Sequence, residues 1–380
     1  MCSDPDFGRR KVWWELAHIT AREMRIIYDW VLYLFQTKPT TMKKLQLSVV
    51  AALAACAAGA AYGQQKELNL YSARHYQTDE ALYANFTKQT GIKINRIEAG
   101  DAELLERIKN EGANSPADIF ITVDAARLSK ADELGLFTPW KSKVLESRIP
   151  AHLRTEDWVA FSTRARVIVY NKTTINPTDV QNYEDLANPK LKGKVCMRSG
   201  SNPYNLSLGA ALVEHIGEAK TEAWAKGVVA NFARSPKGGD TDQIKSVAAG
   251  ECGVTLANSY YVARMLRSEK PEDKKYVANF GVVWPNQKTT GTHINVSGGG
   301  ILKHAPNKDN AIKFMEYLAS DQAQVYFAVG NNEWPAVPSV KVDNPALNAM
   351  GTFKADTLHI GKLAKNQAVA QKIYDRAGWR

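Results

Sequence analysis

The chain has 380 residues, of which 44% are hydrophobic and 23% are charged, and its formal net charge is +10. This length allows two domains, and the ordinary globular composition excludes a disordered chain and a membrane channel. The sequence has no run of five like charges and no basic stripe with interleaved aromatic residues, which argues against nucleic acid as a partner.

The first apolar segment of the chain has the pattern of a signal peptide. Residues 47–61 form the longest apolar run, which is shorter than the roughly 20 residues needed to span a bilayer. A basic start at residues 42–44 precedes this run, and the small residues Ala61 and Gly63 follow it. We therefore expect a signal peptide over residues 42–63.

This assignment makes Met42 the expected start of the protein. Residues 1–41 are then an N-terminal extension that arises from an upstream start codon chosen in error, and an amphipathic helix on a membrane surface is the alternative. Cys56 also fits a lipoprotein box, so the chain is expected in the periplasm, either free or anchored through Cys56. Residues 64–380 contain 41 Lys and Arg against 34 Asp and Glu, a net charge of +7 that could steer an anionic ligand.

Two cysteines, Cys196 and Cys252, remain beyond the signal peptide. An oxidising exported setting permits them to pair, and a structural disulfide and two buried thiols are both open at this point. The chain has no Cys-x-x-Cys motif, so nothing supports a zinc ribbon or a thioredoxin-like site.

Strands and helices alternate at the start of the exported chain. Periodicity predicts strands over residues 66–71, 91–97 and 118–123, and helices over residues 78–90, 101–110 and 125–134. This β-α-β-α-β-α order is typical of a parallel sheet covered by helices.

Two short apolar runs near the middle, residues 158–161 and 167–170, predict a pair of strands at which the chain could cross into a second lobe. A polar turn at residue 188 is expected to open another strand that reaches Val195. Alternation then resumes, with predicted helices over 206–215, 221–231, 241–249, 260–267 and 308–319 and strands over 253–257, 280–285 and 297–301.

At this point the sequence resembles the ferric-iron-binding periplasmic proteins. Residues 71–76, 118–124 and 164–171 carry this resemblance, while residues 186–194 and a helix over 307–327 are shared more widely among type II solute-binding proteins. Together the similar segments cover nearly all of residues 66–340.

The resemblance implies an α/β fold, the two-lobed type II fold of periplasmic binding proteins with a ligand cleft between the lobes. It assigns residues 66–164 with 291–340 to lobe 1, and residues 165–290 with 341–380 to lobe 2. It also implies the extracytoplasmic solute-binding component of an ABC transporter, a monomer that delivers its ligand to an inner-membrane permease driven by an ATPase.

The resemblance further implies that the transported ligand is Fe³⁺. Ferric iron is a hard ion that prefers anionic oxygen ligands, and phenolate meets that preference. The family's ligand positions match five residues here, which are His75, Tyr76, Tyr204, Tyr260 and Tyr261.

Four phenolates on Fe³⁺ leave a charge of −1, and three arginines could offset it as charge-balancing or anion contacts: Arg74, Arg164 and Arg166. Carbonate or another synergistic anion completes the coordination in some family members. The alternation of Arg164 and Arg166 with apolar residues also fits positions on a strand that face solvent.

Each proposed ligand also has an ordinary structural interpretation. A Tyr-Tyr pair at the start of a helix is commonly core packing, and a single histidine such as His75 commonly lies in a loop with its hydrogen bonds satisfied. Tyr204 depends on a loop whose length varies among relatives. His152, His215, His293 and His304 show no spacing typical of metal ligands.

Two other function classes remain to be considered. The sequence has no phosphate-binding loop, dinucleotide-binding, zinc-protease or nucleophile-elbow motif, so an enzyme is not expected. The same fold could instead bind a small organic anion, a phosphate ester, thiamine or a polyamine. A polyamine would require carboxylates, whereas the candidate residues are tyrosines, a histidine and arginines.

Overall fold

The central feature of the computed structural model, which describes residues 66–74 and 76–380, is a mixed sheet in the order β2-β1-β3-β7-β4-β5. Two further strands, β6 and β8, also pair with β4. The strands are β1 (Glu67–Ser72), β2 (Lys93–Glu98), β3 (Ile119–Thr122), β4 (Trp158–Asn171), β5 (Val254–Asn258), β6 (Phe280–Val283), β7 (Ile294–Ile301) and β8 (Trp334–Pro335).

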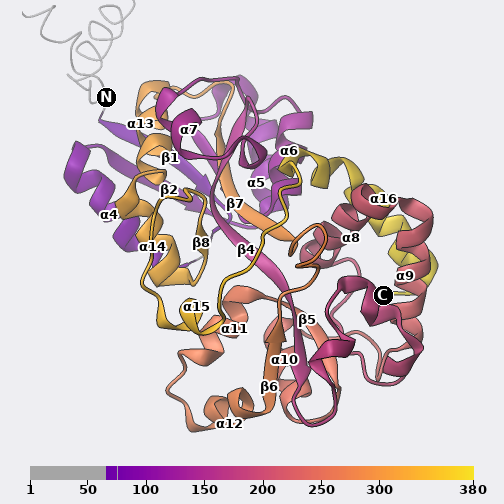
Figure 1. Ribbon diagram of the computed structural model, residues 1–380. Coiled ribbons are helices and arrows are strands. Elements are labelled where there is room, and N and C mark those ends of the chain that lie inside the picture. Colours follow the sequence, from indigo (N-terminus) through magenta and orange to yellow (C-terminus); the bar gives the residue numbers. More distant parts are fainter. Residues whose placement is uncertain (1–65, 75) are drawn as a thin grey trace, which may run out of the picture. The chain divides into compact units, whose positions relative to one another are not determined.

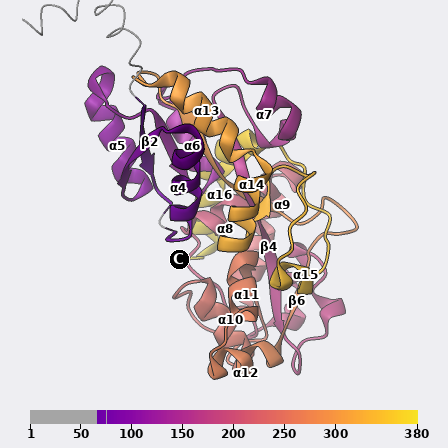
Figure 2. The same ribbon diagram turned by 90° about the vertical axis from the view of Figure 1, so that its left-hand side faces the viewer.

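Helices connect and cover the strands (Figures 1 and 2). The α-helices are α4 (Asp79–Thr90), α5 (Asp101–Glu111), α6 (Ala125–Glu133), α7 (Lys143–Arg148), α8 (Pro203–Ile216), α9 (Glu218–Ala230), α10 (Asp240–Ala248), α11 (Ser259–Leu266), α12 (Pro271–Asn279), α13 (Lys308–Leu318), α14 (Asp321–Asn331), α15 (Pro345–Ala349) and α16 (Ile360–Ala377). Short 3₁₀ helices are η1 (Gly112–Asn114), η2 (Ala151–Leu153), η3 (Pro177–Asp179), η4 (Tyr183–Ala187) and η5 (Pro189–Leu191).

The first three strands form the predicted parallel unit. β1 pairs in parallel with β2 on one side and with β3 on the other. All four residues of β3 are buried, as expected for a strand with both faces covered by helices. The predicted α/β fold of this half is confirmed.

The long strand β4 links two groups of elements. Its residues 158–165 pair antiparallel with β7, and its residues 166–171 pair antiparallel with β5 and β6. In both views β4 extends from the half that holds β1, β2 and β3 to the half that holds β5 and β6 (Figures 1 and 2). The change of partner takes place between Ala165 and Arg166.

The C-terminal helix α16 completes the second half. It packs against α8, α9 and also α6. Its buried Tyr374 and the following Trp379 join Trp224 of α9 in one aromatic cluster, with Tyr374 and Trp379 ring centroids 4.7 Å apart. Burial of these large rings stabilises the packing of α16 on α8 and α9.

The expectation of two short strands over residues 158–161 and 167–170 was wrong. Ser162, Thr163 and Arg164, which interrupt the apolar pattern, are buried within the continuous strand β4. The side chain of Ser162 donates to Glu333, and that of Arg164 donates to the carbonyl of Val123. A polar interruption was therefore mistaken for a break in the strand.

Two other expectations also need correction. The strand expected to reach Val195 is reduced to isolated bridges at Val195, because Pro189 lies in η5 and Gly193 adopts a positive φ of 72°. The single helix expected over 307–327 is two helices, since Ser320 caps α14 by accepting a hydrogen bond from the backbone of Ala323. Helices α7, α12, α15 and α16 were not predicted.

The signal peptide, the extension before it and the Cys56 anchor lie outside the described residues. Within the described part of the chain, no helix is long and apolar enough to cross a membrane.

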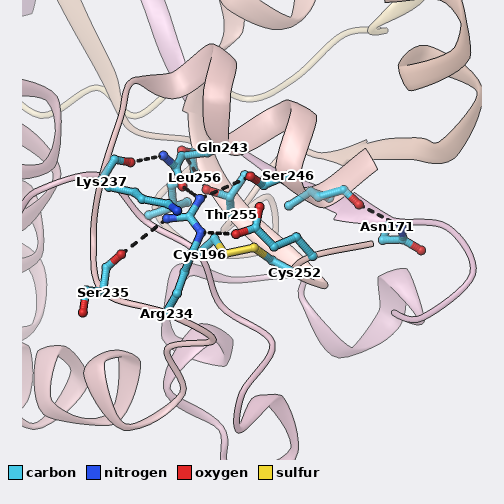
Figure 3. The surroundings of a disulfide bond; sticks show 12 residues. Asn171, Cys196, Arg234, Ser235, Lys237, Gln243, Ser246, Cys252, Thr255 and Leu256 are labelled. Atoms are coloured by element: carbon cyan, nitrogen blue, oxygen red, sulfur yellow. Dashed lines mark hydrogen bonds and ion pairs between the residues drawn. A yellow bond between two sulfur atoms is a disulfide. The ribbon is translucent and has the colours of Figure 1, made fainter. Parts of the chain in front are cut away.

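Cys196 and Cys252 form a disulfide with Cα atoms 5.8 Å apart (Figure 3). Both cysteines are buried, and the backbone N–H of Cys196 donates to the carbonyl of Val254 at 3.0 Å. Beside them, Arg234 donates to Gln243 and Ser246 of α10 and forms an ion pair with Glu251. The disulfide thus joins the segment before α8 to the segment before β5.

Replacing both cysteines by serine is expected to lower the free energy of unfolding by about 2–5 kcal/mol, because the bond closes a 56-residue loop and restricts the unfolded chain. Denaturant unfolding of the oxidised protein and of the Cys196→Ser, Cys252→Ser double variant measures the difference. A reductant should move the original protein toward the double variant and leave the variant unchanged. Equal stabilities of the oxidised protein and the variant would contradict this prediction.

Candidate functional site

Four tyrosines lie beside the first turn of three helices. Tyr76 belongs to the connection between β1 and α4, Tyr204 is the second residue of α8, and Tyr260 and Tyr261 follow the first residue of α11. The N-terminus of a helix favours negative charge, because its backbone N–H groups are unpaired and the peptide dipoles align. Tyr204, Tyr260 and Tyr261 thus lie in the first turns of α8 and α11, and Tyr76 lies in the loop before α4.

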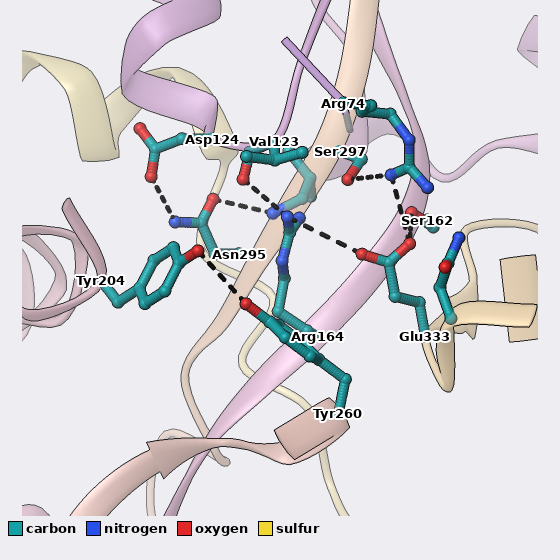
Figure 4. A network of polar contacts seen from close by, with 12 residues as sticks. Arg74, Val123, Asp124, Ser162, Arg164, Tyr204, Tyr260, Asn295, Ser297 and Glu333 are labelled. Carbon is teal, nitrogen blue, oxygen red and sulfur yellow. Dashed lines mark hydrogen bonds and ion pairs between the residues drawn. The ribbon is translucent and has the colours of Figure 1, made fainter. Parts of the chain in front are cut away.

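The four tyrosines are neighbours, and two of their hydroxyl groups meet. The Tyr260 hydroxyl donates to the Tyr204 hydroxyl at 3.2 Å, and the two point toward each other beside Arg164 in Figure 4. The Tyr260 and Tyr261 ring centroids are 4.3 Å apart. Tyr76 lies close enough to influence the pKa of both Tyr204 and Tyr260.

Burial is the main influence on the acidity of these phenols. It raises the pKa of Tyr76, and the negative charge of Glu333 raises it further. It also raises the pKa of Tyr204 and of Tyr260, where the neighbouring phenols add to the effect. Arg164 acts in the opposite direction on all three. The phenols are therefore protonated at neutral pH, and a strongly charged cation is needed to displace their protons.

Arg74 lies under Tyr76. Its Cζ atom is 4.7 Å from the centroid of the Tyr76 ring, and its Nε and Nη2 atoms donate to the carboxylate of Asp79 at 2.8 and 3.2 Å. Nη1 donates to Ser297 at 2.5 Å and to Glu333 at 3.3 Å. All three nitrogen atoms of this guanidinium donate to oxygen acceptors, so the position of Arg74 is fixed.

Arg164 is less completely paired. Its Nη2 donates to the carbonyl of Val123 at 2.6 Å and lies 3.8 Å from Oε1 of Glu333 (Figure 4). Its Nε and Nη1 atoms and Oε1 of Glu333 are buried and have no hydrogen-bond partner among the described residues, which exclude His75. Because leaving a buried charged donor unpaired is costly, these atoms mark a position where a further group can bind.

Glu333 was not identified from the sequence. It is 1% exposed, and its Oε2 accepts hydrogen bonds from Ser162 at 2.8 Å and from Arg74 at 3.3 Å. A single acidic residue between a helix and a two-residue strand carries no periodic or spacing signal. Glu333 reaches the arginines only because β8, which directly follows it, pairs with β4 at Ser162 and Thr163.

The expectation that Arg164 and Arg166 face solvent was wrong, because each is 1% exposed. Arg164 faces the tyrosines, as a charge-balancing residue would. Arg166 instead binds Asp240, Asn205 and Asn258, all in the same half of the protein. The structure therefore gives the two neighbouring arginines of β4 different partners.

His75, the fifth expected ligand, lies outside the described residues. Two other histidines have local partners: His215 pairs with Asp356 at 2.7 Å, and His293 contacts Ser207 at 2.9 Å. Burial lowers the pKa of His293 to about 4, so it is neutral at physiological pH. Among the described residues, no group of three or more His, Cys, Asp or Glu side chains could hold a metal ion.

The family model for bacterial extracellular solute-binding proteins matches residues 81–356 of the chain. Iron uptake protein A1 of Synechocystis is 52% identical over 320 residues, which are 84% of this chain and 89% of the relative. The major ferric iron-binding protein of Neisseria meningitidis is 30% identical over 341 residues, 88% of this chain and all of the relative.

Solved structures agree with these relatives. A Trichodesmium protein (IdiA, FutA) in complex with iron and citrate superimposes with a TM-score of 0.80 at 53% identity, covering 83% of this chain and all of that one. The ferric binding protein of Campylobacter jejuni superimposes with a TM-score of 0.77 at 44% identity, covering 82% and 100%. The predicted type II binding-protein fold is confirmed, and the relatives are binding proteins rather than enzymes.

Replacing Glu333 by glutamine is expected to lower the free energy of unfolding by about 3–5 kcal/mol, because it leaves two buried arginines with less compensating charge. Urea unfolding of the metal-free protein measures the change. Glu272→Gln, at an exposed position of α12, is the matched control and should change stability by less than about 0.5 kcal/mol. Similar losses in the two variants would contradict the role assigned to Glu333.

Proposed function

The chain belongs to the family of bacterial extracellular solute-binding proteins, and from this premise we propose that it binds Fe³⁺ through tyrosine phenolates and delivers it to an ABC importer. The observation that carries the proposal is the gathering of Tyr76, Tyr204, Tyr260 and Tyr261 from three separate segments. Ferric iron is the kind of hard, highly charged ion that can displace phenol protons and bind the resulting anionic oxygens.

His75 is proposed as the fifth ligand. Its position beside Tyr76, after β1, supports this assignment because ligands of such sheets bind beyond the carboxyl ends of the strands. Together His75, Tyr76, Tyr204, Tyr260 and Tyr261 would surround the ion with one nitrogen and four oxygens.

Arg164 is proposed to offset the charge of this site. Four phenolates around Fe³⁺ leave a charge of −1, and Arg164 lowers the pKa of Tyr76, Tyr204 and Tyr260. Its two unpaired donors also suit a small anion beside the iron, such as carbonate. The related Trichodesmium structure holds citrate together with iron. Arg74 is proposed to hold Tyr76 through the contact between its guanidinium and the tyrosine ring. Arg166 is not proposed as an anion contact.

Capture is proposed to occur by closure of two lobes, residues 66–164 with 291–340 and residues 165–290 with 341–380. Tyr76 then belongs to lobe 1, and Tyr204, Tyr260 and Tyr261 belong to lobe 2. The change of partner along β4 at Ala165 and Arg166 supports this boundary. Iron that contacts both lobes would shift the population toward the closed form.

The setting of this activity follows from the family. Solute-binding proteins of ABC importers work with a permease and an ATPase, and we propose that this chain acts as a periplasmic monomer that docks on an inner-membrane permease. The signal peptide over residues 42–63 would direct its export. The names of the relatives favour iron over an organic anion, a phosphate ester, thiamine or a polyamine.

Titration of the purified protein with ferric citrate is expected to produce a visible tyrosinate-to-iron charge-transfer band. Tyr260→Phe and Tyr261→Phe should each shift or abolish the band and weaken binding by more than the roughly 10–100-fold loss caused by removing an outer hydrogen-bond partner of a ligand. Tyr170→Phe on β4 is the control and should leave the band unchanged. A folded protein that shows no band would contradict ferric binding.

Iron affinity is expected to fall as the pH falls, because burial raises the pKa of Tyr76, Tyr204 and Tyr260 and each must lose a proton to bind. Each proton released makes the affinity change by about tenfold per pH unit. Absorbance of the charge-transfer band during acid titration, and proton release on iron addition in weak buffer, measure the effect. Binding without proton release would show that the ligands are not phenols.

A further inference from the structure

Two chain segments present the three tyrosines assigned to lobe 2. One runs from Val195 to Tyr204, and the other runs from Val254 through β5 to Tyr260 and Tyr261. The two segments start side by side, since Val195 and Val254 form a parallel bridge. They then diverge to the starts of α8 and α11. Contacts between the tyrosine-bearing ends of the two segments are needed if the three phenols are to keep one arrangement.

Asp240 lies between these far ends. It is the first residue of α10 and is 1% exposed. Its carboxylate accepts hydrogen bonds from Nη1 of Arg166 at 2.5 Å, from Nη1 of Arg198 at 3.0 Å and from the backbone N–H of Asn258 at 2.7 Å. Its place in the first turn of α10 also stabilises its negative charge.

Arg166 joins the two segments to each other. Its Nη2 donates to the side chain of Asn205 at 2.8 Å, and its Nη1 also donates to the side chain of Asn258 at 3.0 Å. Asn205 directly follows Tyr204, and its own amide donates to the carbonyls of Arg198 and Ser199. A guanidinium can serve several acceptors at once in a fixed geometry.

Arg198 extends the network to the tyrosine rings. Its Cζ atom is 5.2 Å from the centroid of the Tyr204 ring. Although burial lowers the pKa of Arg198, Asp240 raises it, and Tyr261 and Tyr204 raise it further. The charge of Arg198 therefore lies against the ring of Tyr204, and the hydrogen bond to Asp240 holds it there.

The loop from Arg198 to Tyr204 is also held by Trp379, near the C-terminus. The indole N–H of Trp379 donates to the carbonyl of Arg198 at 2.9 Å. A Cβ atom on Gly200 would lie 2.3 Å from the carbonyl oxygen of Trp379, so only glycine fits there. The backbone that leads to Tyr204 is therefore held against the C-terminus as well as against Asp240.

We infer that Asp240 is a positioning residue for the proposed iron site: with Arg166 and Arg198 it holds Tyr204, Tyr260 and Tyr261 as a preformed three-phenol surface. We name these three charged residues the Asp240 clamp. The inference rests on the proposed function and adds to it, because Asp240 and Arg166 bind the backbone and side chains of residues next to the expected ligands, Asn205 and Asn258. A preformed arrangement removes the cost of ordering the ligands when the ion binds.

The main alternative is that the clamp only stabilises the fold. Arg234 provides the matched comparison, because it is a largely buried arginine that also anchors α10 and pairs with an acid, but it faces the disulfide. A variant of Arg234 reports the effect of losing such an anchor without disturbing the tyrosine segments.

The test compares Asp240→Asn, Arg198→Met and Arg234→Met by ferric titration with citrate as competitor, by the position of the charge-transfer band, and by urea unfolding of the metal-free protein. Asp240→Asn and Arg198→Met are expected to weaken iron binding by about 10–100-fold and to shift the band, as found when an outer partner of a metal ligand is lost. Arg234→Met should lower the stability of the metal-free protein and leave the affinity and the band of the folded protein unchanged.

Arg198→Met keeps the test decisive if Asp240→Asn does not fold, because the Arg198 side chain is 18% exposed and its loss buries no new charge. Arg198→Lys should restore part of the affinity, since it keeps the positive charge near Tyr204. Unchanged affinity and band in folded Asp240→Asn or Arg198→Met, beside a normal band in the original protein, would overturn the clamp alone. A missing band in the original protein would overturn the proposed function and the clamp with it.

Discussion

A guanidinium group taken out of water must be met by acceptors, and three arginines around the tyrosines impose this constraint. Arg74, Arg164 and Arg166 are each 1% exposed. Their acids, Asp79, Glu333 and Asp240, come from three distant parts of the chain and are buried as well. Because the desolvation of each charge must be offset by its acidic partner and by the hydrogen-bond acceptors around it, the positions of these segments are tightly specified. The surroundings of the tyrosines are therefore rigid even though the tyrosines lie at the starts of helices.

The strand β4 carries two of these arginines, and each has different partners. Arg164 and Arg166 are two residues apart on the same face of the strand, yet the sheet changes partner between them. Arg164 consequently meets Glu333 and the carbonyl of Val123, while Arg166 meets Asp240. One strand thus joins both proposed lobes to the tyrosines. Arg164 lies toward the first lobe, and Arg166 lies toward the second, where both of its Nη atoms donate to side chains.

Two opposing influences act on the pKa values of the phenols. Burial raises the pKa of Tyr76, Tyr204 and Tyr260, while Arg164 lowers it at each of them. Such a balance disfavours weakly charged cations, which cannot displace the protons, and favours a trivalent ion that can. Under the proposed function, ion selectivity and the dependence of binding on pH both arise from these three phenols and Arg164.

The sequence by itself determined most of the elements and the candidate ligands. Periodicity located β1, β2, β3 and the helices between them, because short-range patterns of apolar residues reflect burial directly. Resemblance indicated the ferric-binding family and pointed to the tyrosines. The tertiary structure decided which charges surround them: Arg74 meets Glu333 across 259 residues and Arg166 meets Asp240 across 74. The energy of a buried ion pair depends on the distance between its charges in space, and no local pattern encodes that distance.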